Sequence, residues 1–218
     1  MSDDYNGHVQ PGGPAISRTV EVDGTTVEVR KFSVSEMDNN VYLLRAARTN
    51  AALLIDAADD PGRIAQEIAG VDVVGIVTTH GHWDHWRALD AVRAATGAPA
   101  YAHPADAPLI EATVDRDLAD GGSLAFGDAS VRLIHTPGHT PGSTCVLLGG
   151  THLFTGDTLF PGGPGRTTTP QEFATIMDSL ERRLFTLPDE TWVYPGHGDD
   201  TTLGAERPSI PEWRDRGW

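Results

Sequence analysis

The sequence contains very little cysteine and very little lysine. Cys145 is the only cysteine in 218 residues, so no disulfide can form within the chain. Lys31 is the only lysine. Lysine and arginine together number 16 against 31 acidic residues, which gives a formal net charge of −15. Because nucleic acids and anionic membranes attract basic surfaces, we expect neither as a partner.

Long apolar runs are missing as well. No stretch approaches the roughly 20 apolar residues that span a bilayer. The start of the chain, Met1-Ser2-Asp3-Asp4-Tyr5, lacks the basic and apolar parts of a secretion signal. We therefore expect a cytoplasmic protein.

Hydrophobic residues nevertheless make up 39% of the chain, enough for a substantial core. Residues 1–18 are rich in Gly, Pro and polar residues and are predicted to form a flexible arm. No linker and no repeat of fixed period interrupts residues 19–210. Residues 19–218 are therefore predicted to form one domain.

Short apolar runs alternate with polar turns, a pattern typical of mixed strands and helices. Asp23-Gly24 separates two alternating runs, 19–22 and 26–30, as in a hairpin. Helix starts are indicated at Asp60-Pro61 and at Thr169-Pro170, where Glu172 completes a capping box. Further strands are expected at 41–44, 51–55, 73–77, 100–102, 131–135, 144–148, 152–155 and 192–194, and a further helix at 86–95. This mixture favours an α/β (α+β) fold with sheets inside and helices outside.

The densest group of chemically active residues is the run Thr79-His80-Gly81-His82-Trp83-Asp84-His85. It lies between a predicted strand and a predicted helix, and a turn there can aim several side chains at one point. Imidazole and carboxylate together suit zinc, iron or manganese, and the lack of cysteine argues against a closed structural zinc site. The turn therefore predicts a metal site.

Three further candidate ligands each follow a predicted strand and lie beside Gly or Pro. They are His139, Asp157 and His197. Seven ligands exceed what one tetrahedral ion takes, but they suit two ions that share a bridging carboxylate.

These residues resemble the signature of the metallo-β-lactamase-fold hydrolases: His-x-His-x-Asp-His on a turn, then a distant His, Asp and His. The resemblance covers residues 26–207 and implies a four-layer αββα sandwich with two divalent ions at one edge, zinc being favoured over iron or manganese. It also implies a role for each ligand. His80, His82 and His139 would hold the first ion, Asp84, His85 and His197 the second, and Asp157 would bridge, with Asp56 bracing the turn from behind.

Within that family the motifs look most like the short, single-domain type of glyoxalase II-like thioester hydrolases. Long glyoxalase II proteins carry a helical C-terminal domain that helps recognise glutathione, and this chain ends 21 residues after His197. The implied reaction is attack of a metal-bridging hydroxide, oriented by Asp84, on the carbonyl of a small S-acyl thiol. A thiolate leaves readily, so no strong general acid is required.

Other functions remain open at the level of sequence. A persulfide dioxygenase of the same family would use one iron at His80, His139 and Asp157. A lactonase would often have Gly-Gly after the turn, whereas Trp86-Arg87 follows here. A di-iron electron-transfer or oxygen-reducing module would usually add a flavin domain.

Substrate contacts are harder to identify. Arg166 is predicted either to anchor the substrate or to be an ordinary surface arginine, and Trp83 to line the pocket. Tyr194 is predicted either to pack in the core or to offer its hydroxyl to the substrate. Trp213 and Trp218 are expected to cover apolar surface on this chain or a neighbouring subunit, so a monomer or a homodimer is possible.

Overall fold

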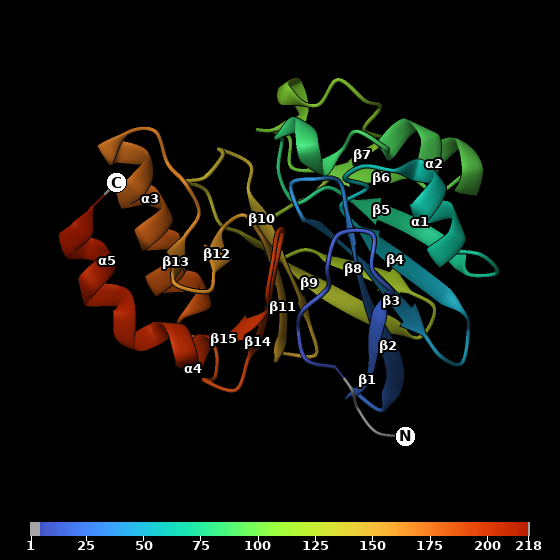
Figure 1. The fold of residues 1–218 in the computed structure, drawn as a ribbon, viewed down its shortest axis with the longest axis horizontal. Coiled ribbons are helices and arrows are strands. Elements are labelled where there is room, and N and C mark those ends of the chain that lie inside the picture. The colour runs from blue at the N-terminus through green and yellow to red at the C-terminus, as the bar shows by residue number, and fades with distance from the viewer. Residues whose placement is uncertain (1–4, 218) are drawn as a thin grey trace.

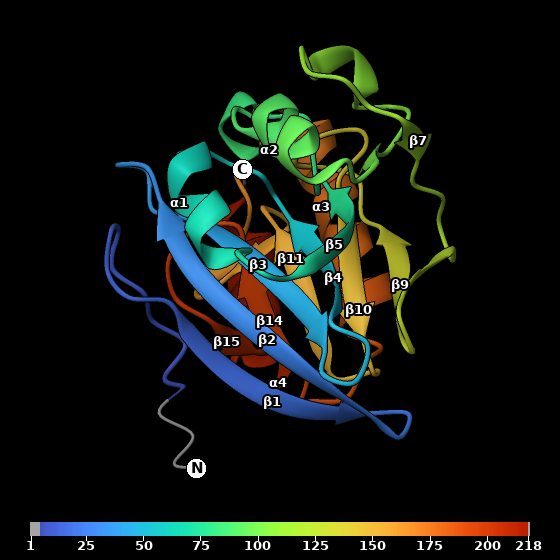
Figure 2. The same ribbon diagram turned by 90° about the vertical axis from the view of Figure 1, so that its right-hand side faces the viewer.

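Two β-sheets lie face to face, and helices cover the outer face of each sheet (Figure 1). The structure is a computed structural model and describes residues 5–217. A view turned by 90° shows the first sheet in front of the second, with α1 and α2 on its near side (Figure 2). The expected αββα arrangement is confirmed.

The first sheet contains seven strands, which lie side by side in chain order. Neighbours from β1 to β4 are antiparallel, and neighbours from β4 to β7 are parallel. The strands are β1 (Ile16–Val22), β2 (Thr25–Val34), β3 (Asn39–Ala46), β4 (Ala51–Ile55), β5 (Asp72–Val77), β6 (Ala100–Ala102) and β7 (Arg116–Asp117). Val22 pairs with Thr25, which confirms the two-residue turn at Asp23-Gly24.

The second sheet has six strands in the order β15-β14-β11-β10-β9-β8. Only β11 and β14 are parallel neighbours. Its strands are β8 (Ser123–Phe126), β9 (Ala129–His135), β10 (Thr144–Leu148), β11 (His152–Gly156), β14 (Trp192–Pro195) and β15 (Thr201–Thr202). The Gly/Pro-rich loop after Asp157 contains a small ribbon of its own, β12 (Leu159–Phe160) and β13 (Gly163–Pro164).

The helices lie in two groups. α1 (Pro61–Glu67) and α2 (Leu89–Thr96) cover the first sheet, and α3 (Pro170–Ser179), α4 (Leu203–Glu206) and α5 (Ile210–Arg216) cover the second (Figure 1). The start signals are confirmed: Asp60 and Thr169 each accept a hydrogen bond from the backbone three residues on. In the predicted capping box, the Glu172 carboxylate also accepts from the amide and hydroxyl of Thr168. None of the described helices has the length and apolarity to cross a membrane.

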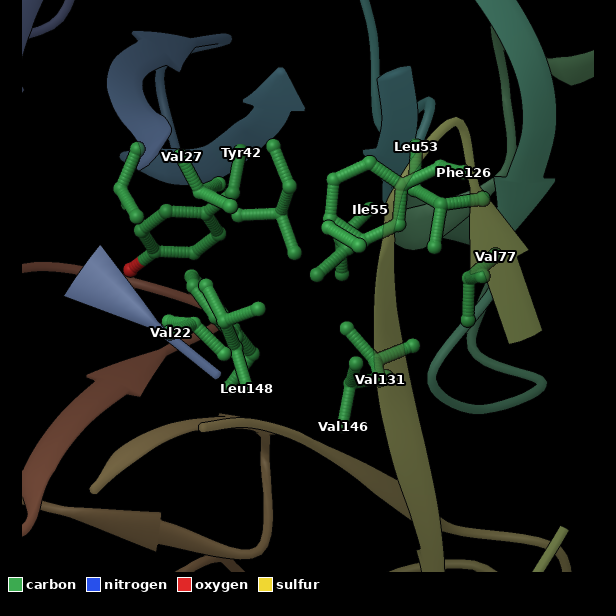
Figure 3. Close-up of a cluster of buried hydrophobic side chains, with 14 of the residues drawn as sticks. Val22, Val27, Tyr42, Leu53, Ile55, Val77, Phe126, Val131, Val146 and Leu148 are labelled. Carbon is green, nitrogen blue, oxygen red and sulfur yellow. The ribbon is translucent and has the colours of Figure 1, made fainter. Parts of the chain in front are cut away.

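Three apolar clusters hold the layers together. The one between the sheets is the inner core, to which Tyr42, Phe126 and Val146 contribute (Figure 3). A second cluster joins the first sheet to α1 and α2. The third joins the second sheet to Met177 of α3, to Leu180 just after that helix, and to Trp213 of α5. Apolar burial on this scale is the main stabilising contribution to the fold.

The predicted arm requires a correction. β1 begins at Ile16 rather than Thr19, and Val9 is buried. Residues 1–4 of the arm lie outside the described residues. The Lys31 ammonium donates to the carbonyl of Gly7 and forms an ion pair of 2.7 Å with Asp200, and both side chains are fully buried. The segment after Tyr5 is therefore fastened to the first sheet.

Candidate metal centre

The run from Thr79 to His85 lies where β5 ends, as predicted. It turns into a short 3₁₀ segment, Trp83–His85, before α2. Asp56, at the end of β4, braces this turn. It accepts hydrogen bonds from the amide and hydroxyl of Thr79, both at 2.8 Å, and its Oδ2 lies 2.9 Å from Nδ1 of His85. The buried carboxylate therefore occupies the position expected of a bracing residue.

The second sheet supplies the other three predicted ligands. His139 lies in the turn between β9 and β10, Asp157 follows β11, and His197 follows β14. Because β11 and β14 are parallel neighbours, their carboxyl ends bring Asp157 and His197 to one edge of the sheet. Gly196 lies against this site: a β-carbon there would collide with Asp157 Oδ1 and approach His85. The crowding explains why glycine precedes His197.

All seven predicted ligands converge. Three groups of side chains each place their nitrogen or oxygen atoms within 4.8 Å of one another. They are His80, His82 and His139, which we call the first trio; Asp84, His85 and His197, the second trio; and His80, His85 and Asp157, which links the two.

Asp157 lies between the two trios. Its Oδ2 is 3.5 Å from Nε2 of His139 and 3.6 Å from Nε2 of His197. Its Oδ1 is 3.4 Å from Nε2 of His85. One carboxylate therefore faces nitrogens of both trios, which is the arrangement that a bridging ligand requires.

The outer hydrogen bonds fix which nitrogen of each ring faces inward. Nδ1 of His139 lies 2.7 Å from the carbonyl of Arg166, and Nδ1 of His197 lies 2.8 Å from that of Met37. A carbonyl can only accept, so both Nδ1 atoms donate and each Nε2 presents a lone pair to the centre. In His82 it is Nδ1 that lies inward, 3.1 Å from Nε2 of His80.

The centre contains polar atoms that no protein group satisfies. Nε2 of His139 and Oδ1 of Asp157 are buried and have no hydrogen-bond partner. Such atoms are costly to bury, by about 1–3 kcal/mol each. Lone pairs that converge without donors are what a cation satisfies, and the imidazole and carboxylate set suits first-row divalent metals. The residues present therefore fit a binuclear metal site.

The charges around the centre are strongly coupled. Burial, followed by the neighbouring imidazoles, lowers the pKa of His80 well below its ordinary value. Burial also lowers the pKa of His85, but the charges of Asp157 and Asp56 outweigh it and raise that pKa to about 9. Burial and the surrounding imidazoles disfavour the charged form of His80, so its lone pair is available to a cation.

The predicted substrate contacts have different outcomes. Tyr194 is fully buried between the sheets, stacked on Phe154 at 4.6 Å, so its role is core packing and the prediction of a pocket hydroxyl is wrong. Trp83 is 52% exposed beside the ligands, with the Arg87 guanidinium over its ring. Arg166 is exposed and touches the site through its backbone carbonyl, which orients His139.

Sequence reasoning missed Asn39, at the start of β3. Its side-chain amide donates to both the backbone carbonyl and Oδ2 of Asp84, each at 3.0 Å. A β-bridge pairs the same residue with His197. Nothing in the local sequence marks this asparagine, because its partners lie 45 and 158 residues away.

The remaining cysteine, histidine and tryptophan side chains near the ligand turns lie outside the centre. Cys145 is buried mid-strand, and burial raises the pKa of its thiol to about 11. His103 and His135 stack on each other at 4.1 Å, and His152 contacts the Tyr194 hydroxyl. Trp86 packs against the helix-side core and donates from its indole to Gly81.

Comparison with known proteins identifies relatives of the same kind. The family described as the Metallo-beta-lactamase superfamily matches residues 34–197. A "Hydroxyacylglutathione hydrolase" of Rhodospirillum rubrum is 35% identical over 175 residues, which cover 79% of this chain and 67% of that protein. The "Probable metallo-hydrolase YqgX" of Bacillus subtilis is 34% identical over 205 residues, covering 84% and 95%.

Solved structures agree with the fold. ETHE1 from Myxococcus xanthus superposes with a TM-score of 0.75 at 34% identity, over 84% of this chain and 83% of that one. TTHA1623 in a di-iron-bound form superposes with a TM-score of 0.70 at 31% identity, over 83% and 98%.

Proposed function

Because the chain belongs to the metallo-β-lactamase superfamily, we propose that it is a metal-dependent hydrolase of a small thioester, the S-acyl derivative of a low-molecular-weight thiol. The observation that carries the proposal is the position of Asp157, 3.4–3.6 Å from nitrogens of both trios. An aspartate there supports two ions, for which we propose zinc. The 35% sequence identity to a protein named "Hydroxyacylglutathione hydrolase" supports a thioester as the bond cleaved.

The proposed reaction gives the metal ligands and Asp84 different roles. Two divalent ions would supply Lewis acidity and lower the pKa of water toward about 7. The histidines of both trios present lone pairs to hold them. Burial raises the pKa of the Asp84 carboxyl, but the neighbouring imidazoles of His197 and His85 and the Asn39 amide outweigh burial and lower that pKa. Its carboxylate is therefore ionised at neutral pH and can orient the attacking water through a hydrogen bond.

Substrate selection is proposed to involve side chains at the rim. Trp83 offers an exposed aromatic face beside two ligands, and Arg166, whose backbone carbonyl contacts His139, carries an exposed guanidinium. An anionic group on the thiol would pair with that guanidinium. Replacing Arg166 by Ala should then raise KM for anionic thioesters more than for neutral ones, and Arg166→Lys should recover part of the loss. Equal effects on both substrate types would remove Arg166 from the proposal.

The decisive experiment is thiol release from a panel of thioesters by zinc-loaded protein. S-lactoylglutathione, other S-acyl thiols and the matching oxygen esters would be compared, with released thiol detected by a chromogenic disulfide. The buried Cys145 gives little background in that assay. We expect thioesters to be cleaved well ahead of their oxygen esters. Fully metallated protein that leaves every thioester intact would overturn the proposal, as would persulfide consumption with oxygen uptake by a one-iron form.

A further inference from the structure

One buried carboxylate lies behind the ligand turns and has no part in the function proposed so far. Asp106 precedes a short 3₁₀ segment, Ala107–Leu109, and its side chain is fully buried. No arginine or lysine of the described residues forms an ion pair with it. Burying a carboxylate without a cation is costly unless hydrogen bonds compensate.

The compensating donors come from two separate ligand turns. Oδ2 of Asp106 accepts from the amide of Gly81 at 2.7 Å and from the Thr140 hydroxyl at 2.5 Å, and Oδ1 accepts from the amide of Gly142 at 2.6 Å. Gly81 lies between His80 and His82, and Thr140 follows His139. A single carboxylate therefore joins the two turns that carry the first trio.

Packing keeps the same segment against both turns. A β-carbon on Gly142 would lie 2.6 Å from the Asp106 carboxyl carbon, and one on Gly81 would lie 2.8 Å from Leu109. His103, three residues before Asp106, stacks on His135 at the end of β9, with ring planes 6° apart. Residues 103–109 thus dock on the β5 turn and on the β9–β10 turn together.

The second trio has different supports. Asn39 holds Asp84, Asp56 holds His85, and the Met37 carbonyl orients His197. None of these contacts involves residues 103–109. The two halves of the centre can therefore respond separately to a change at Asp106.

We propose that Asp106 is a positioning residue that sets the spacing between the His80–His82 pair and His139, and so controls ion binding at the first trio. The inference concerns metal binding alone, so its test does not depend on whether the substrate is a thioester.

The test is metal binding by Asp106→Asn. An asparagine turns an NH₂ group toward amide or hydroxyl donors, which separates the two turns. Outer residues of this kind typically change metal affinity about 10–100-fold. Titration of metal-free protein with Zn²⁺ against a chromophoric chelator should therefore show one site of wild-type affinity and one weakened by about that factor.

Ligand variants identify the site that is lost. With Asp106→Asn in place, adding His82→Ala should change the titration little, since both act on the first trio, whereas adding His197→Ala should abolish the remaining tight binding. Asp115→Asn is the matched control. Asp115 also accepts a backbone amide, that of Ala100, and pairs with Arg93, but it lies away from the centre.

A milder variant covers the case in which Asp106→Asn fails to fold. Thr140→Val removes one of the three donors to Asp106 with little change in volume, and should weaken the same site by a smaller factor. Folded Asp106→Asn that binds two ions with wild-type affinity would overturn the proposal, as would equal weakening of both sites. If only Thr140→Val folds, unchanged zinc affinity in that variant would overturn it as well.

Discussion

Asp157 lies against histidines of both halves of the candidate metal centre. Asp157→Ala removes a carboxylate that lies within 3.6 Å of nitrogens of all three of His85, His139 and His197. We expect both ions to bind more weakly and hydrolysis to fall with them. Metal content by elemental analysis, measured beside thioesterase activity, checks this. Retained activity in the variant would rule out the bridging position.

His152 should make the protein sensitive to mild acid. Burial and the charge of Arg18 lower its pKa from the ordinary 6.5 to about 4. Between those values the unfolded chain binds the proton and the folded chain does not, so stability falls as pH falls from about 6.5 toward about 4. His152→Asn keeps an acceptor for the Tyr194 hydroxyl. Relative to wild type, its Tm should fall less by about 2–4 °C between pH 6.5 and 5; equal slopes would contradict the assignment.

Single residues were predictable where the chemistry is local. The turn from His80 to His85 carries four ligands in six residues, and the later ligands each follow a strand beside Gly or Pro. Asp106, Asn39 and Tyr194 carry no such mark. Their roles depend on what the fold brings beside them: ligand turns for Asp106, Asp84 for Asn39, and the inner core for Tyr194.

Among the elements, α3 has the clearest local signal, and its cap can be tested directly. The Thr169 hydroxyl accepts from the amide of Glu172 at 3.1 Å. Thr169→Ala should cost about 1 kcal/mol of unfolding free energy. Thr175→Ala, exposed on the same helix, should be neutral or slightly stabilising because alanine favours helix. Urea unfolding of both variants measures the difference, and equal values would mean that the cap contributes nothing.

The shortest elements could not be predicted from the sequence pattern. β7, β12, β13 and β15 have two residues each, too short for any alternation to register. β8 (Ser123–Phe126) was also missed, although its pairing with β9 helps to build the second sheet. After His197, α4 has only four residues and α5 has a proline in its first turn, so neither shows an apolar stripe. Long elements with caps or continuous apolar runs were predicted to within a few residues.

On the scale of the whole molecule, the centre joins the two sheets. The turn after β5 belongs to the first sheet, whereas His139, Asp157 and His197 belong to the second. Bound ions should therefore stabilise the folded state, by about 2.7 kcal/mol for a site at 100-fold excess over Kd. Dialysis against a chelator should lower the Tm, and zinc should restore it. Asp157→Ala, already poor in metal, should respond far less; an unchanged wild-type Tm would contradict a metal link between the sheets.

The burial of Lys31 has a practical consequence. Among the described residues the surface carries its positive charge on arginine alone, since this one ammonium lies inside the protein beside Asp200. Amine-reactive esters and lysine-specific proteases should leave residue 31 untouched until the first sheet opens. Peptide mapping after brief labelling in rising urea would then follow global unfolding through a single natural probe. Modification of Lys31 under native conditions would show instead that the segment after Tyr5 detaches by itself.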